Sequence, residues 1–223
     1  MKRRPPAARL AVRALAVGVA GALTVLLAQV PVGATFTAST DTGGNSVTTA
    51  ANFCLRTDYI PPAAVAWINE AAPTTNQTDT TTLYVRSKAS ASARTWLRFD
   101  LPPAKPGCVL QAATLRMENR LPGTPTIIDA FRGDPTAPDW TSTSITWANQ
   151  PVGVGTPVGG SIQTIPGQQV WGITPEVVEQ YSSGINHGFV LQDRYEASST
   201  GIEQRYDGAL TGPTAPHLQL DWR

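Results

Sequence analysis

The stretch Thr95–Leu101, with the sequence TWLRFDL, decides the fold class because apolar and polar side chains alternate along it. Leucine or phenylalanine stands at positions 97, 99 and 101, and charged residues stand at positions 98 and 100. Successive side chains of an extended chain point to opposite faces, so this pattern predicts a β-strand with one face against an apolar core. Trp96 is out of phase with those apolar residues, and we expect its indole to face away from that core, either exposed or covered by a loop.

Runs of the same kind recur on both sides of this stretch, separated by Gly- and Pro-rich segments that favour turns. The predicted strands are Val65–Ile68, Thr82–Arg86, Thr95–Leu101, Ala113–Glu118, Thr126–Phe131, Ser144–Trp147, Val170–Ile173, Gly188–Gln192 and His217–Trp222. One short helix is expected, with Thr174 as its N-cap, Pro175 in its first turn and Gly184 at its end. About nine or ten short strands with one helix predict an all-β fold, an antiparallel β-sandwich with a jelly-roll-like topology.

Residues 1–34 have the pattern of a cleaved export signal. Five basic residues and no acidic residue occur there, and the apolar run Ala14–Ala28 is followed by Val32 and Ala34, which suit the −3 and −1 positions of a cleavage site. The run has about 15 residues, fewer than the roughly 20 that span a bilayer, so we expect cleavage; an uncleaved membrane anchor is the alternative. Residues 35–52 are polar and rich in Thr and Gly, which predicts a flexible arm, and residues 53–223 are the expected sandwich domain.

Outside the predicted leader the chain has 12 basic and 16 acidic residues, and Lys88 and Lys105 are its only lysines. A protein that binds DNA or RNA needs a basic face to neutralise phosphates, and this composition offers none. Nucleic acid is therefore not an expected partner.

Cys54 and Cys108 are the only cysteines of the chain. An exported protein meets an oxidising environment, so a single disulfide between them is expected. Two separate buried thiols are the alternative. A cysteine metal site is not expected, because no CxxC or HxxxH spacing accompanies them.

Three groups of segments follow one another in an order and spacing that resemble the DNRLRE domain, which overlaps carbohydrate-binding module family 96. The first group comprises Val65–Glu70 (VAWINE), Thr82–Arg86 (TLYVR), Arg94–Leu101 (RTWLRFDL) and Ala112–Met117 (AATLRM). The second is Trp140–Pro151 (WTSTSITWANQP), the most specific of the three, and the third is Gly184–Gln192 (GINHGFVLQ) with Pro216–Trp222 (PHLQLDW). The resemblance covers about Ala63–Arg223 and implies a β-sandwich that binds carbohydrate.

Two departures from that family pattern occur. Residues 141–143 are Thr, Ser and Thr where the family often has an acid, and only Glu203–Tyr206 (EQRY) stands near the place of its late acidic segment. Residues 33–50 are similar to the start of camelysin- or TasA-like exported precursors of Gram-positive bacteria. That second likeness implies a bacterial, secreted or cell-surface setting.

The sequence holds few residues that suit catalysis. It has no GxSxG or HExxH motif, and its two histidines, His187 and His217, are expected to be turn or surface residues. Paired carboxylates could serve a glycosidase, but sequence spacing does not bring the available acids together. The acids considered are Glu118, Asp134, Asp139 and Glu203. No enzymatic activity is therefore predicted, with polysaccharide cleavage by paired carboxylates as a minor alternative.

Six tryptophans allow two interpretations, because indoles fill sandwich cores and also stack on the apolar faces of sugar rings. Trp147 and Trp222 alternate in phase with aliphatic neighbours, which favours the core. The outward-facing positions of two neighbouring strands predict a ligand-binding patch, in which arginines would suit an acidic sugar such as a uronate. Its residues are Tyr84, Arg86, Arg94, Trp96 and Arg98. A solvated strand face is the alternative.

A structural calcium ion is a further hypothesis, since loop acids supply the hard oxygen ligands that calcium prefers. Asp79, Asp134 and Asp139 are the candidates, although none belongs to a DxDxDG run. No other cofactor is expected.

These observations predict a secreted or cell-surface, non-catalytic β-sandwich module. Its expected partners are polysaccharide or other cell-envelope components, without a stable membrane span after cleavage of the leader. A structural or adhesive surface protein that assembles through residues 35–52 is the rival hypothesis.

Overall fold

The computed structural model describes residues 37–41, 44–48, 54–122, 124–163, 165–196 and 201–223, and the predicted leader lies outside them. The chain divides into two compact units, Met1–Thr49 and Ala50–Arg223. In the first unit, β1 (Thr37–Asp41) pairs antiparallel with β2 (Gly44–Thr48). The sequence analysis predicted no strands in that segment.

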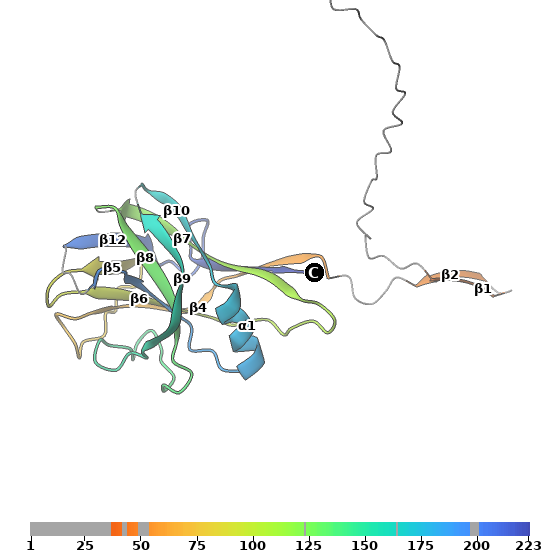
Figure 1. The fold of residues 1–223 in the computed structure, drawn as a ribbon, viewed down its shortest axis with the longest axis horizontal. Helices are drawn as coiled ribbons and strands as arrows, with labels where there is room; N and C mark the ends of the chain where they lie inside the picture. Colours follow the sequence, from red (N-terminus) through yellow and green to blue (C-terminus); the bar gives the residue numbers. More distant parts are fainter. Residues whose placement is uncertain (1–36, 42–43, 49–53, 123, 164, 197–200) are drawn as a thin grey trace, which may run out of the picture. The chain divides into compact units, whose positions relative to one another are not determined.

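The second unit contains eleven strands, all paired antiparallel, and one helix among the described residues (Figure 1). The strands are β3 (Arg56–Ile60), β4 (Pro62–Asn69), β5 (Thr82–Ser87), β6 (Ala93–Phe99), β7 (Leu110–Pro122), β8 (Thr126–Gly133), β9 (Gly153–Gln163), β10 (Gly167–Gly172), β11 (Phe189–Asp193), β12 (Ile202–Asp207) and β13 (His217–Trp222). The helix, α1 (Thr174–Ser183), stands between β10 and β11.

The strands form one continuous ladder that folds over into two layers around a common core. One layer runs β4–β6–β11–β8–β9. In the other, β7 pairs with β13 and β12 along one edge and with β10 along the other, and β3 and β5 flank β13 and β12. The layers are joined where β5 meets β6, through the single pair Arg86↔Ala93, and by the β9–β10 connection. The predicted all-β antiparallel sandwich with one short helix is confirmed.

Alternating burial along the strands places one face of each layer in this main core. In β7 and β13, buried apolar residues alternate with half-buried ones over most of each strand. Trp171 and Tyr206 are fully buried there with an edge-to-face contact between their rings, and the Trp171 indole N–H donates to the Ile128 carbonyl at 2.8 Å. The indole N–H therefore keeps a hydrogen-bond partner in an otherwise apolar core.

A second, smaller core lies on the outer face of β4, β6 and β11, where Ala66, Trp96 and Val190 pack with Trp140 and Ile145 from residues 134–152. Trp96 faces away from Leu97 and Phe99, as its phase predicts, but its side chain is 0% exposed. Of the two alternatives for Trp96, exposed or covered by a loop, the second is confirmed, because the segment after β8 covers that face; Trp96 is therefore not part of an exposed patch.

The predicted strand Ser144–Trp147 lies in that covering segment, and this prediction is wrong: the structure folds these residues as turns. Asn149 accepts hydrogen bonds from the backbone N–H and hydroxyl of Thr146, and its amide donates to the Ser144 carbonyl. Short polar side chains that bond to nearby backbone compete with strand pairing, which is why the apolar spacing of this segment misled.

The helix begins and ends where the sequence predicted. Thr174 does not cap it; its hydroxyl accepts a hydrogen bond from Ala113 N–H at 2.9 Å and so ties α1 to β7. Gly184 ends the helix in the left-handed conformation, with φ of 70°. None of the described helices is long and apolar enough to cross a membrane.

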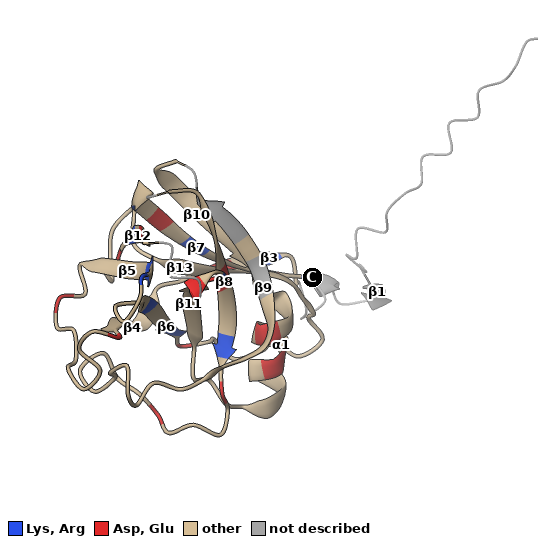
Figure 2. Cartoon of the chain, turned by 60° about the vertical axis from the view of Figure 1, so that its left-hand side comes forward, with Lys and Arg blue, Asp and Glu red and all other residues tan. Residues whose placement is uncertain are grey.

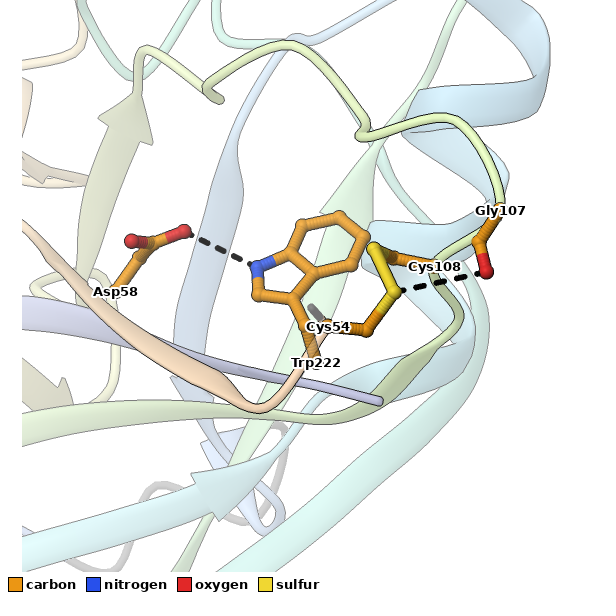
Figure 3. The surroundings of a disulfide bond; sticks show 5 residues. All are labelled: Cys54, Asp58, Gly107, Cys108 and Trp222. Atoms are coloured by element: carbon orange, nitrogen blue, oxygen red, sulfur yellow. Dashed lines mark hydrogen bonds between the residues drawn. A yellow bond between two sulfur atoms is a disulfide. The ribbon is translucent and has the colours of Figure 1, made fainter. Parts of the chain in front are cut away.

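The predicted disulfide is present. Cys54 and Cys108 are bonded, with 5.3 Å between their Cα atoms (Figure 3). The bond joins the segment before β3 to the loop between β6 and β7. Beside it, Trp222 donates from its indole nitrogen to the Asp58 carboxylate at 3.1 Å. The disulfide therefore ties the start of β3 to the loop before β7, and the Trp222–Asp58 contact ties β3 to the end of β13.

Candidate functional site

A pocket of about 300 Å³ lies at the turn between β5 and β6, and we call it the hairpin pocket. Strand pairing builds it: Asn69 at the end of β4 lies opposite Ala93 at the start of β6, which brings the residue after β4 beside the turn. The other walls come from the residues after β11 and from the segment that covers the second core. The lining residues are Glu70, Lys88, Ser90, Ser92, Arg94, Trp147 and Glu196.

The turn of the pocket is held by its own hydrogen bonds. Glu70 N–H donates to the Ser92 carbonyl at 2.9 Å, and Ser92 N–H donates to the Glu70 carboxylate at 3.0 Å. The Ser92 hydroxyl donates to the Lys88 carbonyl at 3.1 Å, and Ser90 has a φ of 55°, in the left-handed region that few residues other than glycine adopt. The shape of the turn is therefore fixed without a ligand.

Arg94 connects two walls of the hairpin pocket, the residues after β11 and the segment that covers the second core. Its Nε donates to both oxygens of Glu196, at 3.2 and 3.0 Å, and its Nη1 donates to Gln150 Oε1 at 3.2 Å. Its guanidinium lies 4.7 Å from the centroid of the Trp147 ring. Gln150 Oε1 also accepts a hydrogen bond from the indole N–H of the buried Trp96 at 3.3 Å. Trp96 and Arg94 therefore share this acceptor, which links the second core to the pocket.

The pocket holds two carboxylates close enough to affect one another. Burial raises the pKa of the Glu196 carboxyl, the charges of Glu70 and Asp193 add to this rise, and Arg94 opposes it without cancelling it. Burial is therefore the largest cause of the raised pKa of Glu196, and it outweighs the pairing with Arg94.

These groups together suit a ligand with many hydroxyls, each of which donates one hydrogen bond and accepts others. The carboxylates of Glu70 and Glu196 accept, the ammonium of Lys88 and the hydroxyl of Ser90 donate, and Trp147 supplies an apolar wall. Figure 2 shows acidic and basic residues close together around β4, β5 and β6, where this pocket lies. The volume is at the lower end of the range for small-molecule sites.

The five residues of the predicted ligand patch do not form one surface. Arg94 lines the hairpin pocket, and Arg86 lies under its turn, where it donates to the Ala91 carbonyl at 2.6 Å. Tyr84 packs on Trp67 with 4.5 Å between ring centroids.

The other two members of the patch are occupied within the second core. Trp96 is buried, as described above. Arg98 donates to the Trp140 carbonyl at 3.0 Å and lies 5.6 Å from the centroid of that ring. Ligand contact by Tyr84, Arg86, Arg94 or Arg98 stays a prediction.

All lining residues of the pocket other than Arg94 escaped the sequence analysis as ligand candidates: Glu70, Lys88, Ser90, Ser92, Trp147 and Glu196. Glu70 and Glu196 are far apart in sequence and meet only through the pairing of β4 and β11 with β6. Trp147 was predicted in the core; it is half-buried, packs against the second core and also faces the pocket. A hint was available in Lys88, one of two lysines outside the leader, which stands between two predicted strands.

The acids considered for catalysis or calcium make other contacts. Glu203 pairs with Arg86 at 3.1 Å and with Arg205 at 2.7 Å, and Glu118 is half-buried on β7. Asp139 lies 3.6 Å from Nδ1 of the buried His187.

Asp79 and Asp134 each accept hydrogen bonds from the backbone N–H and the hydroxyl of the threonine two residues later, which lowers the pKa of each carboxyl. In the part of the chain that the structure describes, no group of three or more His, Cys, Asp and Glu side chains is arranged to hold a metal ion. Calcium binding stays a prediction of the sequence.

The comparison with protein families agrees with the resemblance seen in the sequence. The model of carbohydrate-binding module family 96 matches residues 56–220, from the first residue of β3 into β13, and this range includes every residue of the hairpin pocket. No curated protein matches the chain. Because the match covers well over half of the chain, the protein belongs to carbohydrate-binding module family 96, whose members are described as binding modules.

Proposed function

We propose that this protein is exported and binds a cell-wall or extracellular polysaccharide through the hairpin pocket. Family membership supports carbohydrate as the ligand class. The location rests on one observation: two carboxylates, two cations and two serines line the same pocket as the indole of Trp147. The leader pattern of residues 1–34 and the Cys54–Cys108 bond support export.

The hairpin pocket favours hydroxyl recognition over recognition of a sugar carboxylate. Arg94, the cation best shaped to fork onto a carboxylate, already pairs with Glu196, and a ligand carboxylate would have to displace that pair. Lys88 is exposed at the rim and can attract an acidic sugar as a point charge. The predicted preference for a uronate therefore rests on Lys88 and not on the arginines.

Retention of the purified protein on a panel of neutral and acidic polysaccharides tests this proposal. Lys88→Ala and Trp147→Ala each remove one wall of the pocket and should weaken binding about tenfold, by loss of a charged hydrogen bond or of an aromatic contact. Lys105→Ala is the matched control, because that lysine is exposed in the loop between β6 and β7 and does not line the pocket.

Two outcomes contradict the proposal in different ways. Retention that is equal for the wild type and both pocket variants would move the site elsewhere on the molecule. Failure of the wild type to bind any polysaccharide would favour the rival hypothesis of a structural or adhesive surface protein.

Polysaccharide cleavage is a second candidate, favoured by one observation: Glu70 and Glu196 line the same pocket, and the pKa of Glu196 is raised. A carboxyl with a raised pKa suits a general acid, and a second carboxylate nearby suits a base or nucleophile. Release of reducing sugar that disappears in Glu196→Gln would support it. Absence of release from a polysaccharide that the protein retains would leave binding as the function.

A further inference from the structure

A second hollow, separate from the hairpin pocket, lies between β3 and the loop that joins β12 to β13. Its volume is about 390 Å³. Tyr59 and Pro61 form one side, and Leu210, Pro213 and His217 belong to the other. We call it the Tyr59 groove.

An exposed aromatic ring forms the side wall of this groove. Tyr59 is 66% exposed and Leu210 is 48% exposed, although both are large apolar side chains. The Tyr59 ring meets the His217 ring edge to face, with 5.9 Å between centroids, so its orientation is held from one side. An oriented and solvent-exposed ring is suited to stacking against the apolar face of a sugar.

The loop side of the groove is shaped before any ligand arrives. Asp207, at the end of β12, is 2% exposed and accepts hydrogen bonds from Ala209 N–H, from the Thr214 hydroxyl and from Arg120. Pro213 and Pro216 fix the backbone further along. A preformed groove loses little conformational entropy when it binds.

The charge of the groove indicates the class of ligand. Its lining residues include no Asp, Glu, Lys or Arg, in contrast to the hairpin pocket, which has two acids and two bases. His217 Nδ1 lies 3.2 Å from the Ala215 carbonyl, which can only accept, so Nδ1 carries the proton and Nε2 is the acceptor of the neutral ring. The groove therefore offers hydroxyl groups and an imidazole, without an Asp, Glu, Lys or Arg side chain, which suits the hydroxyls of a neutral sugar.

We propose that the Tyr59 groove is a second carbohydrate-binding site, which stacks a neutral sugar ring on Tyr59 and hydrogen-bonds its hydroxyls through His217 and Thr211. This inference rests on the proposed function, since it assigns the same class of ligand to a second place. Two sites on one polysaccharide chain would raise the overall affinity above that of either site alone.

The two histidines of the chain give a direct test, because His217 lines the groove and His187 is buried behind Trp140. The imidazole C–H signals of the protein are followed by NMR while cellohexaose, mannohexaose or xylohexaose is added. At least one of these neutral oligosaccharides should shift the His217 signal and leave the His187 signal in place.

Variants separate the groove from the hairpin pocket. Tyr59→Ala should abolish the His217 shift and weaken polysaccharide retention about tenfold, whereas Tyr59→Phe, which keeps the ring, should retain both. Lys88→Ala should leave the His217 shift unchanged. Because Tyr59 is mostly exposed, the unfolding midpoint should stay close to that of the wild type in all three, which a urea titration checks.

A His217 signal that moves with none of the oligosaccharides overturns the second site. If polysaccharide retention still depends on Lys88 in that case, binding by the hairpin pocket stands without the second site. If retention does not depend on Lys88 either, the hairpin pocket and the Tyr59 groove are both excluded as binding sites. A shift caused by a proline-rich decapeptide and by no sugar would also overturn the inference, since it would make the groove a peptide site. A His217 shift together with retention that ignores Lys88 would support the groove and contradict the hairpin pocket.

Discussion

Arg94 is the residue on which the hairpin pocket depends most, because it holds Glu196, Gln150 and the Trp147 ring at the same time. A lysine at this position would keep the charge but could not form the planar fork that makes these contacts together. The geometry of the pocket, and not only its charge, is therefore tied to a guanidinium.

Arg94→Lys should weaken polysaccharide binding about tenfold, since the two walls that Arg94 connects would no longer be fixed. Arg98→Lys is the matched control: Arg98 lies on the same strand and packs on Trp140, outside the pocket. Isothermal titration of both variants with a bound polysaccharide measures the difference. Equal affinities for the two would show that Arg94 has no special part in the site.

Trp96 shows what alternation along a strand can and cannot predict. The period of two assigned its direction correctly, away from Leu97 and Phe99. Its burial depends on residues 134–152, which fold back over the strand and whose apolar spacing at Ser144–Trp147 predicted a strand instead of the turns that form there. The loop that turned an outward face into a second core could not be predicted from the strand that it covers.

Among the elements, the turn into β11 makes a close backbone approach to β6 that a side chain would disturb. Gly188 has a φ of 76°, and a Cβ atom there would collide with the Leu97 carbonyl of β6. Gly184, at the end of α1, has a similar φ of 70° but open space around its Cα. Substitutions at these two glycines therefore distinguish the cost of backbone strain alone from the cost of strain combined with steric overlap.

Gly184→Ala should lower the free energy of unfolding by about 1 kcal/mol, the cost of a left-handed residue with a side chain. Gly188→Ala should cost more than about 4 kcal/mol or prevent folding, because strain and overlap combine and β6 must shift. Urea unfolding of the two variants gives the comparison. Equal losses would show that β6 and β11 are not packed as described.

The loop after β12 should respond to acid through Asp207. Burial raises the pKa of this carboxyl, but hydrogen bonds from Thr214, Ala209 and Arg120 outweigh it and leave the pKa lowered. A lowered pKa in the folded state means that the carboxylate stabilises the fold above its unfolded pKa and loses this contribution as pH falls through the folded value.

The free energy of unfolding of the wild type should therefore fall more steeply between about pH 5 and pH 2 than that of Asp207→Asn. Urea titrations over this range give both curves. Asp207→Asn should also weaken any binding in the Tyr59 groove, whose loop Asp207 holds. Parallel pH curves for the two proteins would contradict this account of the carboxylate.

Elements were predicted well where apolar residues alternate and poorly where they do not. The alternating sequence runs that form β5, β6, β7 and β13 were predicted as strands. β9 was missed because glycines and Pro157 interrupt its sequence. β12 was missed because its sequence, IEQRYD, is mostly polar, although Ile202, Gln204 and Tyr206 are buried. Gln204 is satisfied there by the Asn119 side chain at 2.9 Å, a pairing that only the folded sheet creates.

At the scale of the whole molecule, the Cys54–Cys108 bond closes a loop with a sequence separation of 54 residues and secures the outermost strand of one layer. That strand, β3, carries Tyr59 and is paired with β13. Loss of the bond should loosen β3 before the rest of the sandwich, since β3 pairs on one edge alone in the described sheet.

Replacing both cysteines by serine should lower the free energy of unfolding by about 3–4 kcal/mol, the value expected when a loop of this length is no longer closed in the unfolded chain. Urea unfolding of the double variant measures it, and reductant added to the wild type should give a loss of the same order. Unchanged stability in both experiments would mean that the bond constrains nothing.

The order of motifs along the chain predicted the family, and the family predicted the ligand class, but neither predicted the site. Glu70, Lys88 and Glu196 follow three different strands, and β-pairing across the sheet brings them together. Sequence spacing does not reveal which strand ends lie side by side in the folded sheet. For this reason the predicted patch shared only Arg94 with the hairpin pocket.

The affinity of Lys88→Ala/Trp147→Ala for the polysaccharide that the wild type binds, compared with that of Lys105→Ala, tests most directly that the hairpin pocket binds carbohydrate. We predict that the double variant loses at least about tenfold in affinity, while Lys105→Ala binds as the wild type does. Equal affinity of the three proteins would contradict the account.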